Sequence, residues 1–255
     1  MNLLQDGHVA MVPGIKAAGI PCGIKNTEGS PDLALVVSDV PCRAAAVFTT
    51  NKVAAAPVKY DRELLAAHNA LAQALVINSG CANACTGERG MEDARETART
   101  AGAGLHVAPE AVWVMSTGVI GQHLPMDKIR NGVASAIAHL SNEGGHSAAR
   151  AIMTTDTRPK EIAVQVQIEG KTCTIAGMCK GSGMIHPNMA TMLAVIATDA
   201  LVAPDVLQAA LTEATDKSFN MTTVDGDTST NDTLLLLANG LAKNAEIVST
   251  ASAGY

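Results

Sequence analysis

Residues 162–178 read IAVQVQIEGKTCTIAGM, and this stretch decides which kind of sheet the chain forms. Valine and glutamine alternate over residues 162–168, which is typical of a half-exposed strand. Glu169-Gly170 is a two-residue hairpin signal, and the run from Thr172 to Met178 predicts the returning strand. The two strands are therefore expected to pair antiparallel, which excludes a purely parallel sheet.

Outside this hairpin, short apolar runs alternate with amphipathic stretches. Asp39 and Pro41 separate the first two runs, and Asp61 is expected to cap the first helix. Further strands are predicted over residues 33–37, 44–50, 75–78, 112–115, 193–196 and 233–237, and helices over 61–74, 91–105, 127–140 and 204–217. The chain is thus predicted to have a mixed α/β (α+β) fold with sheets layered with helices, without a visible domain boundary.

The composition excludes several classes of protein. Hydrophobic residues make up 47% and charged residues 16% of the 255 positions, which excludes a disordered chain. The net charge of -6 and the aromatic content of 2% argue against a nucleic-acid partner. Residues 1–14 lack the basic and apolar parts of a signal peptide, and no apolar run is long enough to span a membrane. A cytoplasmic protein without a membrane partner is therefore expected.

The usual metal and nucleotide motifs are missing. None of the six cysteines forms a CxxC pair, and Cys81 and Cys85 stand three residues apart without a nearby histidine. Gly170-Lys171-Thr172 resembles the end of a phosphate-binding loop, but Gln165 stands where that loop requires glycine. We therefore expect no metal and no tightly bound cofactor, and small buried thiols.

The segment from Lys180 to Leu193, KGSGMIHPNMATML, has two interpretations. Spacing alone favours a glycine-rich loop that enters a buried strand, with Thr191 as an ordinary strand residue. Alternatively, Thr191 is a nucleophile that the chain exposes by cutting itself after Ala190. The new α-amine, with a pKa of about 8, would then act as the base for the Thr191 hydroxyl.

A second polar group stands at the end of a predicted strand, in Ser116-Thr117-Gly118. The Thr117 hydroxyl and the Gly118 N–H are both donors that can stabilise a developing oxyanion. The alternative is that Thr117 is only a turn residue.

Several segments together carry a resemblance to a known family. They are KGSGMIHPNMATML and, earlier and later in the chain, residues 48–51 (FTTN), 83–87 (NACTG), 116–118 (STG), 153–157 (MTTDT) and 224–232 (VDGDTSTND). In this order they resemble the ornithine acetyltransferases, also called bifunctional glutamate N-acetyltransferases. The resemblance spans nearly the whole chain and implies a sandwich like that of the N-terminal-nucleophile enzymes.

The resemblance implies roles for individual residues. It makes Thr191 the nucleophile, with cleavage between Ala190 and Thr191. Thr117 and Gly118 would form the oxyanion hole. Thr154 and Lys180 would bind substrate beside Thr191.

The resemblance also implies the reaction. N2-acetylornithine would acetylate Thr191, and glutamate would take the acetyl group by a ping-pong scheme in arginine biosynthesis. Acetyl-CoA is a further donor in some members. Residues 1–190 would form an α chain and residues 191–255 the beginning of a β chain that the family continues beyond Tyr255. Two α and two β chains are expected to assemble.

One departure and two rival functions stand beside this expectation. Cys81 replaces an asparagine that is common in the family, so the role of the turn at residues 78–81 is in question. A self-processing aminopeptidase of similar architecture would use the same nucleophile on peptides. A non-catalytic assembly protein would have no use for both Ala190-Thr191 and Thr117-Gly118.

Overall fold

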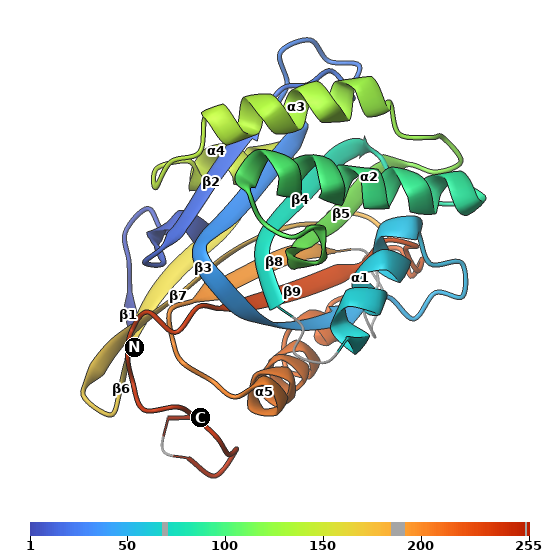
Figure 1. Ribbon diagram of the computed structural model, residues 1–255. Helices are drawn as coiled ribbons and strands as arrows, with labels where there is room; N and C mark the ends of the chain where they lie inside the picture. Colours follow the sequence, from blue (N-terminus) through green and yellow to red (C-terminus); the bar gives the residue numbers. More distant parts are fainter. Residues whose placement is uncertain (68–70, 185–191, 253) are drawn as a thin grey trace.

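The computed structural model describes residues 1–67, 71–184, 192–252 and 254–255 (Figure 1). One continuous sheet follows the order β1-β6-β7-β8-β9-β3-β4-β5, and β2 pairs with β3 at its side. Its strands are β1 (Asn2–Leu3), β2 (Ile15–Ile20), β3 (Leu33–Phe48), β4 (Leu71–Cys81), β5 (Val112–Val119), β6 (Lys160–Ile168), β7 (Lys171–Lys180), β8 (Leu193–Thr198) and β9 (Thr233–Ala238).

The helices pack against this sheet, mostly on its outer faces, although the helix at Gly145–Ala151 contributes Ala148, Ala149 and Ala151 to the core between the two halves of the sheet. They are α1 (Ala56–Ala66), α2 (Gly87–Leu105), α3 (Met126–Ala138), α4 (Gly145–Ala151) and α5 (Pro204–Asp216), with short 3-10 turns at Val9–Met11, Pro109–Ala111 and Phe219–Met221. Among the residues in the described ranges, no helix combines the length and the apolar composition needed to cross a bilayer.

Strand β3 joins two halves of the sheet. Its residues 33–37 pair with β4, whereas residues 43–48 pair with β9, and the register with β4 shifts between Val37 and Cys42. Residues 33–37 and 44–50 were predicted as separate strands, which is wrong, because the segment with Asp39 and Pro41 is a bulge within one strand. Because β3 is long and bends at the bulge, it pairs with strands of both halves of the sheet.

The two halves face each other across a central core. Leu75 and Ile77 of β4 and Met115 of β5 share this core with Val195 of β8 and Leu235 of β9. A second core lies between β2–β5 and helices α1, α2 and α3, and a third lies between β7–β9 and α5. The layers therefore run helix, sheet, sheet, helix, as Figure 1 shows, and the predicted mixed α/β fold is confirmed.

The hairpin predicted over residues 162–178 is confirmed, and its strands extend one or two residues further, to Lys160–Ile168 and Lys171–Lys180. Strands β6 and β7 pair antiparallel with Ile168 opposite Lys171. Glu169 and Gly170 between them have φ of 47° and 78°, so both adopt the left-handed conformation of a tight hairpin turn.

The predicted helix over residues 61–74 is wrong at both ends. It begins at Ala56, and residues from Leu71 onward already belong to β4. Asp61 does not cap the helix, because its fully buried carboxylate accepts a hydrogen bond from the Val114 N–H of β5 at 3.0 Å. Strand β2 and helix α4 were not predicted.

Candidate functional site

Three chain segments meet at one edge of the central strands. Lys180 ends β7 and stands opposite Leu193, the first residue of β8. Leu193 in turn stands beside Thr233, the first residue of β9. The predicted cleavage residues Ala190 and Thr191 lie outside the described residues. In the sequence, however, only Met192 separates Thr191 from Leu193, the first residue of β8.

Lys180 is a buried cation at this edge. Only 4% of the residue is exposed, and its Nζ lies 3.5 Å from the Thr154 Oγ1. Burial lowers the Lys180 pKa below its ordinary value, although the charges of Asp156 and Asp232 act in the opposite direction. The structure thus brings together two of the predicted substrate-binding residues, and a carboxylate ligand would match the ammonium group.

The loop that carries Thr154 is fixed by a single carboxylate. Asp156 accepts hydrogen bonds from the Gly181 N–H at 2.9 Å, from the Thr154 N–H at 3.3 Å and from the Lys160 ammonium. Burial raises the Asp156 pKa, but these hydrogen bonds outweigh it and hold the pKa below the usual range. Asp156 therefore stays ionised and ties Thr154 to the end of β7.

Thr117 and Gly118 lie at the end of β5, beside the end of β4. Thr117 is buried, and no described residue receives a hydrogen bond from its hydroxyl group. Gly118 has a φ of 132°, a conformation that side-chain-bearing residues rarely adopt. Its backbone also pairs directly with Gly80. Two donors thus stand next to each other at this strand end, and the backbone conformation at the second one favours glycine.

The turn expected at residues 78–81 is wrong, because these residues form the irregular end of β4, and Asn78 holds this strand end. Its Nδ2 donates to the Cys81 carbonyl at 2.8 Å, and its Oδ1 accepts the Ser116 hydroxyl at 2.6 Å. Cys81 itself is buried, and its thiol lies 3.4 Å from the Gln122 carbonyl. The residue that departs from the family pattern is therefore the last residue of β4, at a strand end that Asn78 stabilises.

Asn231 is a polar residue of this region to which sequence analysis gave no role. Its Nδ2 donates to the Ala82 carbonyl at 2.6 Å and to the Ser116 carbonyl at 2.8 Å. The amide thus joins the loop before β9 to the strand end that carries Thr117. The segment VDGDTSTND contributed to the resemblance, but a polar loop offers no periodicity that would single out this asparagine.

Carboxylates of the same loop hold both flanks of residues 185–191. The Met184 N–H donates to Asp225 at 2.7 Å, and the Met192 N–H donates to Asp232 at 2.8 Å. Neither aspartate was predicted as a site residue. The only signal in the sequence was the concentration of aspartate, threonine and asparagine before a buried strand.

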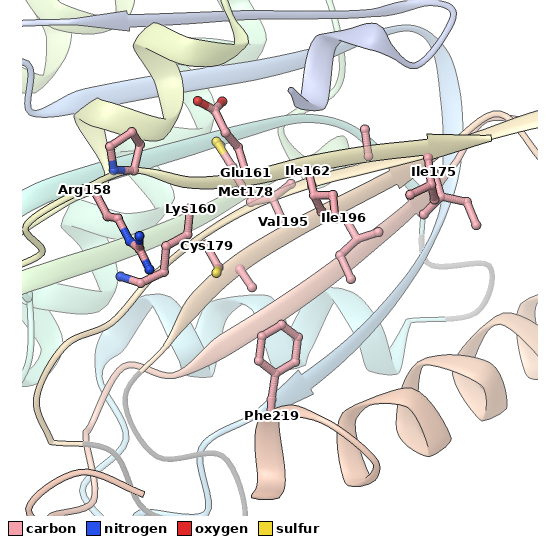
Figure 2. Close-up of a pocket in the computed structure, with 15 residues that line it drawn as sticks. Arg158, Lys160, Glu161, Ile162, Ile175, Met178, Cys179, Val195, Ile196 and Phe219 are labelled. Carbon is pink, nitrogen blue, oxygen red and sulfur yellow. The ribbon is translucent and has the colours of Figure 1, made fainter. Parts of the chain in front are cut away.

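A separate groove of about 540 Å³ crosses β6, β7 and β8 (Figure 2). Ile196 and Cys179 line it, Phe219 faces the strands, and Arg158 stands toward one end. None of the predicted site residues that the structure describes lines this groove. Successive strand residues point to opposite faces, so Lys180 projects away from Cys179 and from the groove.

The described residues contain no group of three or more histidine, cysteine, aspartate or glutamate side chains placed to hold a metal ion. The carboxylates at the edge of β7–β9, those of Asp156, Asp225 and Asp232, already accept backbone N–H groups, and the other polar groups there are a lysine, hydroxyls, amides and backbone donors. Such groups bind carboxylates and stabilise oxyanions.

A family model, curated relatives and solved structures all relate this chain to ArgJ proteins or ornithine acetyltransferases. The model of the ArgJ family matches residues 16–253. The arginine biosynthesis bifunctional protein ArgJ of Symbiobacterium thermophilum is 57% identical over 243 residues, which are 95% of this chain and 60% of that protein. The chain thus spans about 60% of the length of the curated relative it matches.

Two solved structures resemble this fold. The ornithine acetyltransferase of Mycobacterium tuberculosis, complexed with ornithine, matches with a TM-score of 0.67 and 40% identity, over 75% of this chain and 98% of that chain. An L-aminopeptidase D-Ala-esterase/amidase of Ochrobactrum anthropi, a variant of the Ntn hydrolase fold, matches with a TM-score of 0.56 and 14% identity, over 93% of this chain and 77% of that chain. The second likeness concerns the fold alone, and it agrees with the predicted sandwich.

Proposed function

Because this chain belongs to the ArgJ family, we propose that it carries the nucleophile of an enzyme that transfers acetyl from N2-acetylornithine to glutamate. The observation that carries the proposal is the Lys180–Thr154 contact of 3.5 Å at the edge where β8 begins. A buried ammonium beside a hydroxyl suits the α-carboxylate of an amino-acid substrate, and it stands in register with the strand that follows Thr191.

The first proposed step is self-cleavage. The Thr191 hydroxyl attacks the Ala190 carbonyl carbon, the peptide C–N bond breaks, and the acyl group of Ala190 passes to oxygen as an ester. Water then hydrolyses the ester, which leaves a carboxylate on Ala190 and a free α-amine on Thr191. The α-amine takes up the proton of the hydroxyl in later steps.

The second proposed step is acetyl transfer. The Thr191 oxygen attacks the acetyl carbonyl of acetylornithine, while the Thr117 hydroxyl and the Gly118 N–H stabilise the oxyanion. The amide C–N bond breaks, the leaving nitrogen receives the proton, and ornithine departs. The amine of glutamate then attacks the acetyl ester and leaves as N-acetylglutamate, which restores Thr191. Acetyl-CoA would enter the same scheme as an alternative donor.

The proportions of the ornithine acetyltransferase chain support the cleavage proposal. The region matched between the two chains is 75% of this chain and 98% of the ornithine acetyltransferase chain. A piece that ends at Ala190 would be about the same three quarters of the 255 residues. We propose that the pieces before and after the cut remain together and that two such pairs assemble.

Mass spectrometry and a turnover assay test the proposal together. A piece that begins at Thr191 is expected from the purified protein, and Thr191→Ala should abolish both this piece and acetyl transfer. Transfer that survives Thr191→Ala would refute the nucleophile. Hydrolysis of small peptides without transfer from acetylornithine would instead favour an aminopeptidase.

A further inference from the structure

Asp232 is a buried carboxylate beside the start of β8. Only 1% of the residue is exposed, and its Oδ1 accepts the Met192 N–H at 2.8 Å. The Met192 carbonyl in turn accepts the Thr233 N–H at 3.1 Å. Both backbone polar groups of the residue after Thr191 are therefore held by two consecutive residues, Asp232 at the end of a loop and Thr233 at the start of β9.

The backbone of Asp232 is itself fixed from both layers of the sandwich. Its carbonyl accepts the Thr49 N–H at 2.9 Å, just after β3. The neighbouring Asn231 side chain donates to the Ser116 carbonyl of β5 and to the Ala82 carbonyl after β4. The Asp232 carboxylate is consequently placed relative to the strand end that carries Thr117 and Gly118.

We infer that Asp232 is a positioning residue, anchored by Asn231, that fixes the backbone next to Thr191 relative to the oxyanion donors at Thr117 and Gly118. This inference rests on the proposed function, in which Thr191 is the nucleophile. Small displacements of a nucleophile reduce rates by orders of magnitude, so the loss of a partly buried hydrogen bond one residue away is expected to have a large effect. The negative charge also opposes the loss of the proton from Lys180.

The same chain offers a matched control for the aspartate. Asp199 is also buried, at 3% exposure, and its Oδ1 accepts the Thr174 N–H at 2.7 Å. It lies just after Thr198, at the opposite end of β8 from Met192. Replacing either carboxylate removes the acceptor of a backbone N–H, but only Asp232 adjoins the proposed site.

The experiment follows cleavage of freshly translated 255-residue chain by intact mass over time. Asp232→Ala is expected to slow the appearance of the Thr191 piece about 10-fold or more, and Asp199→Ala to leave the rate within about twofold. Asp232→Asn should recover most of the rate, because the amide oxygen can still accept the Met192 N–H. Equal rates for wild type and Asp232→Ala, or equal slowing by Asp199→Ala, would overturn the inference.

Substitutions of Asn231 give an independent test. Here the variant of similar shape should be slower than the alanine variant, which is the reverse of the order expected at Asp232. Asn231→Asp places a carboxylate against two carbonyl oxygens, so it should slow cleavage more than Asn231→Ala despite its closer shape. Asn244 is the control, because its buried amide also bridges two carbonyls, those of Leu201 and Ala245. Asn231 variants that cleave as fast as the wild type would contradict the anchoring role.

Hydrogen exchange separates this inference from the proposed function. If the wild-type chain never yields the Thr191 piece, the proposed cleavage fails, whatever Asp232 does. In that case the exchange rate of the Met192 amide still reports on positioning. It should rise at least about 10-fold in Asp232→Ala and stay unchanged in Asp199→Ala. An unchanged rate in Asp232→Ala would overturn the positioning role itself.

Discussion

Gly118 and Gly80 lie side by side at the ends of β5 and β4, and a Cβ built on Gly118 would stand 2.3 Å from the Gly80 carbonyl carbon. The contact is backbone to backbone, so no side chain can rotate away to relieve it. The proposed oxyanion donor is therefore held where only glycine fits on both spatial and conformational grounds.

The first prediction follows from this contact. Gly118→Ala should displace the end of β5, destabilise the protein by about 1–3 kcal/mol and reduce acetyl transfer at least about 100-fold. Thermal unfolding and single-turnover acetylation of the protein measure the two effects.

Gly121→Ala is the matched control for this change. Gly121 has a similarly unusual φ of 83°, but no atom lies within 4 Å of a Cβ placed there. It should lose about 1–2 kcal/mol from conformational strain and keep its transfer rate. If both variants lost activity equally, strain alone and not the placement of Gly118 would explain the result.

The second prediction concerns the Thr117 hydroxyl. Thr117→Val keeps the shape and removes the donor, so the acetylation rate should fall about 100- to 1000-fold with little change in the substrate KM. Thr117→Ser keeps the hydroxyl and should stay within about 10-fold of the wild type. A serine variant as slow as the valine variant would show that the methyl group, rather than the donor, matters.

The third prediction is that replacing Lys180 raises stability and weakens substrate binding. Lys180→Met removes a buried charge, so at pH 7 the protein should become more stable by about 1 kcal/mol or more. The KM for acetylornithine should rise at the same time, because the carboxylate loses its cation. Exposed Lys171 is the control, since Lys171→Met should change stability by less than about 0.5 kcal/mol.

The pH dependence of this effect has a definite sign. Burial lowers the pKa of Lys180 in the folded state, so the folded protein releases this proton at a lower pH than the unfolded chain does. The contribution of Lys180 to wild-type stability should therefore rise as the pH climbs from the lowered pKa toward the ordinary value of about 10.4. The advantage of Lys180→Met in urea unfolding should shrink over this window. A constant advantage would contradict the prediction.

The fourth prediction concerns Asp61 in α1. Its Oδ1 accepts the Val114 N–H, and its buried Oδ2 has no partner among the described residues. Burial raises the pKa of this carboxyl group well above its ordinary value. The contribution of Asp61 to stability should thus be greatest below the ordinary value of about 3.9 and decline as the pH rises toward the raised pKa.

Asp61→Asn tests this sign. The asparagine does not titrate and retains an oxygen for Val114, so its advantage over the wild type should be near zero at pH 4 and reach about 1–3 kcal/mol at pH 8. Urea unfolding at both pH values measures the difference. Asp61→Ala leaves the Val114 N–H unpaired and should destabilise the protein at both pH values.

Features with a local cause could be predicted from the sequence. The hairpin turn at Glu169-Gly170 and the start of α5 at Pro204 depend on residues within a few positions, and both are confirmed. The helix over 61–74 was wrong because Asp61 pairs with a strand 53 residues away. Strand β3 was divided because Pro41 usually interrupts a strand, whereas here it lies in a bulge.

The same distinction applies to the site. The resemblance assigned Lys180 and Thr154 to one substrate site, which stays a prediction, and in the structure their side chains lie 3.5 Å apart. Asn231 and Asp232 were missed as site residues because their bonds reach 149 and 40 residues along the chain. No spacing rule links such distant positions, and only the folded sheet brings them together.

The strand order has a mechanical consequence for a chain that is cut before Thr191. Strands β8 and β9 come after the cut, yet they lie between β7 and β3, which come before it. Each is hydrogen-bonded to a strand of the other piece along its length. Severing the peptide bond would therefore release a chain end without releasing a fragment. Neither piece could exchange with that of another molecule unless the hydrogen bonds between β7 and β8 and between β9 and β3 first broke.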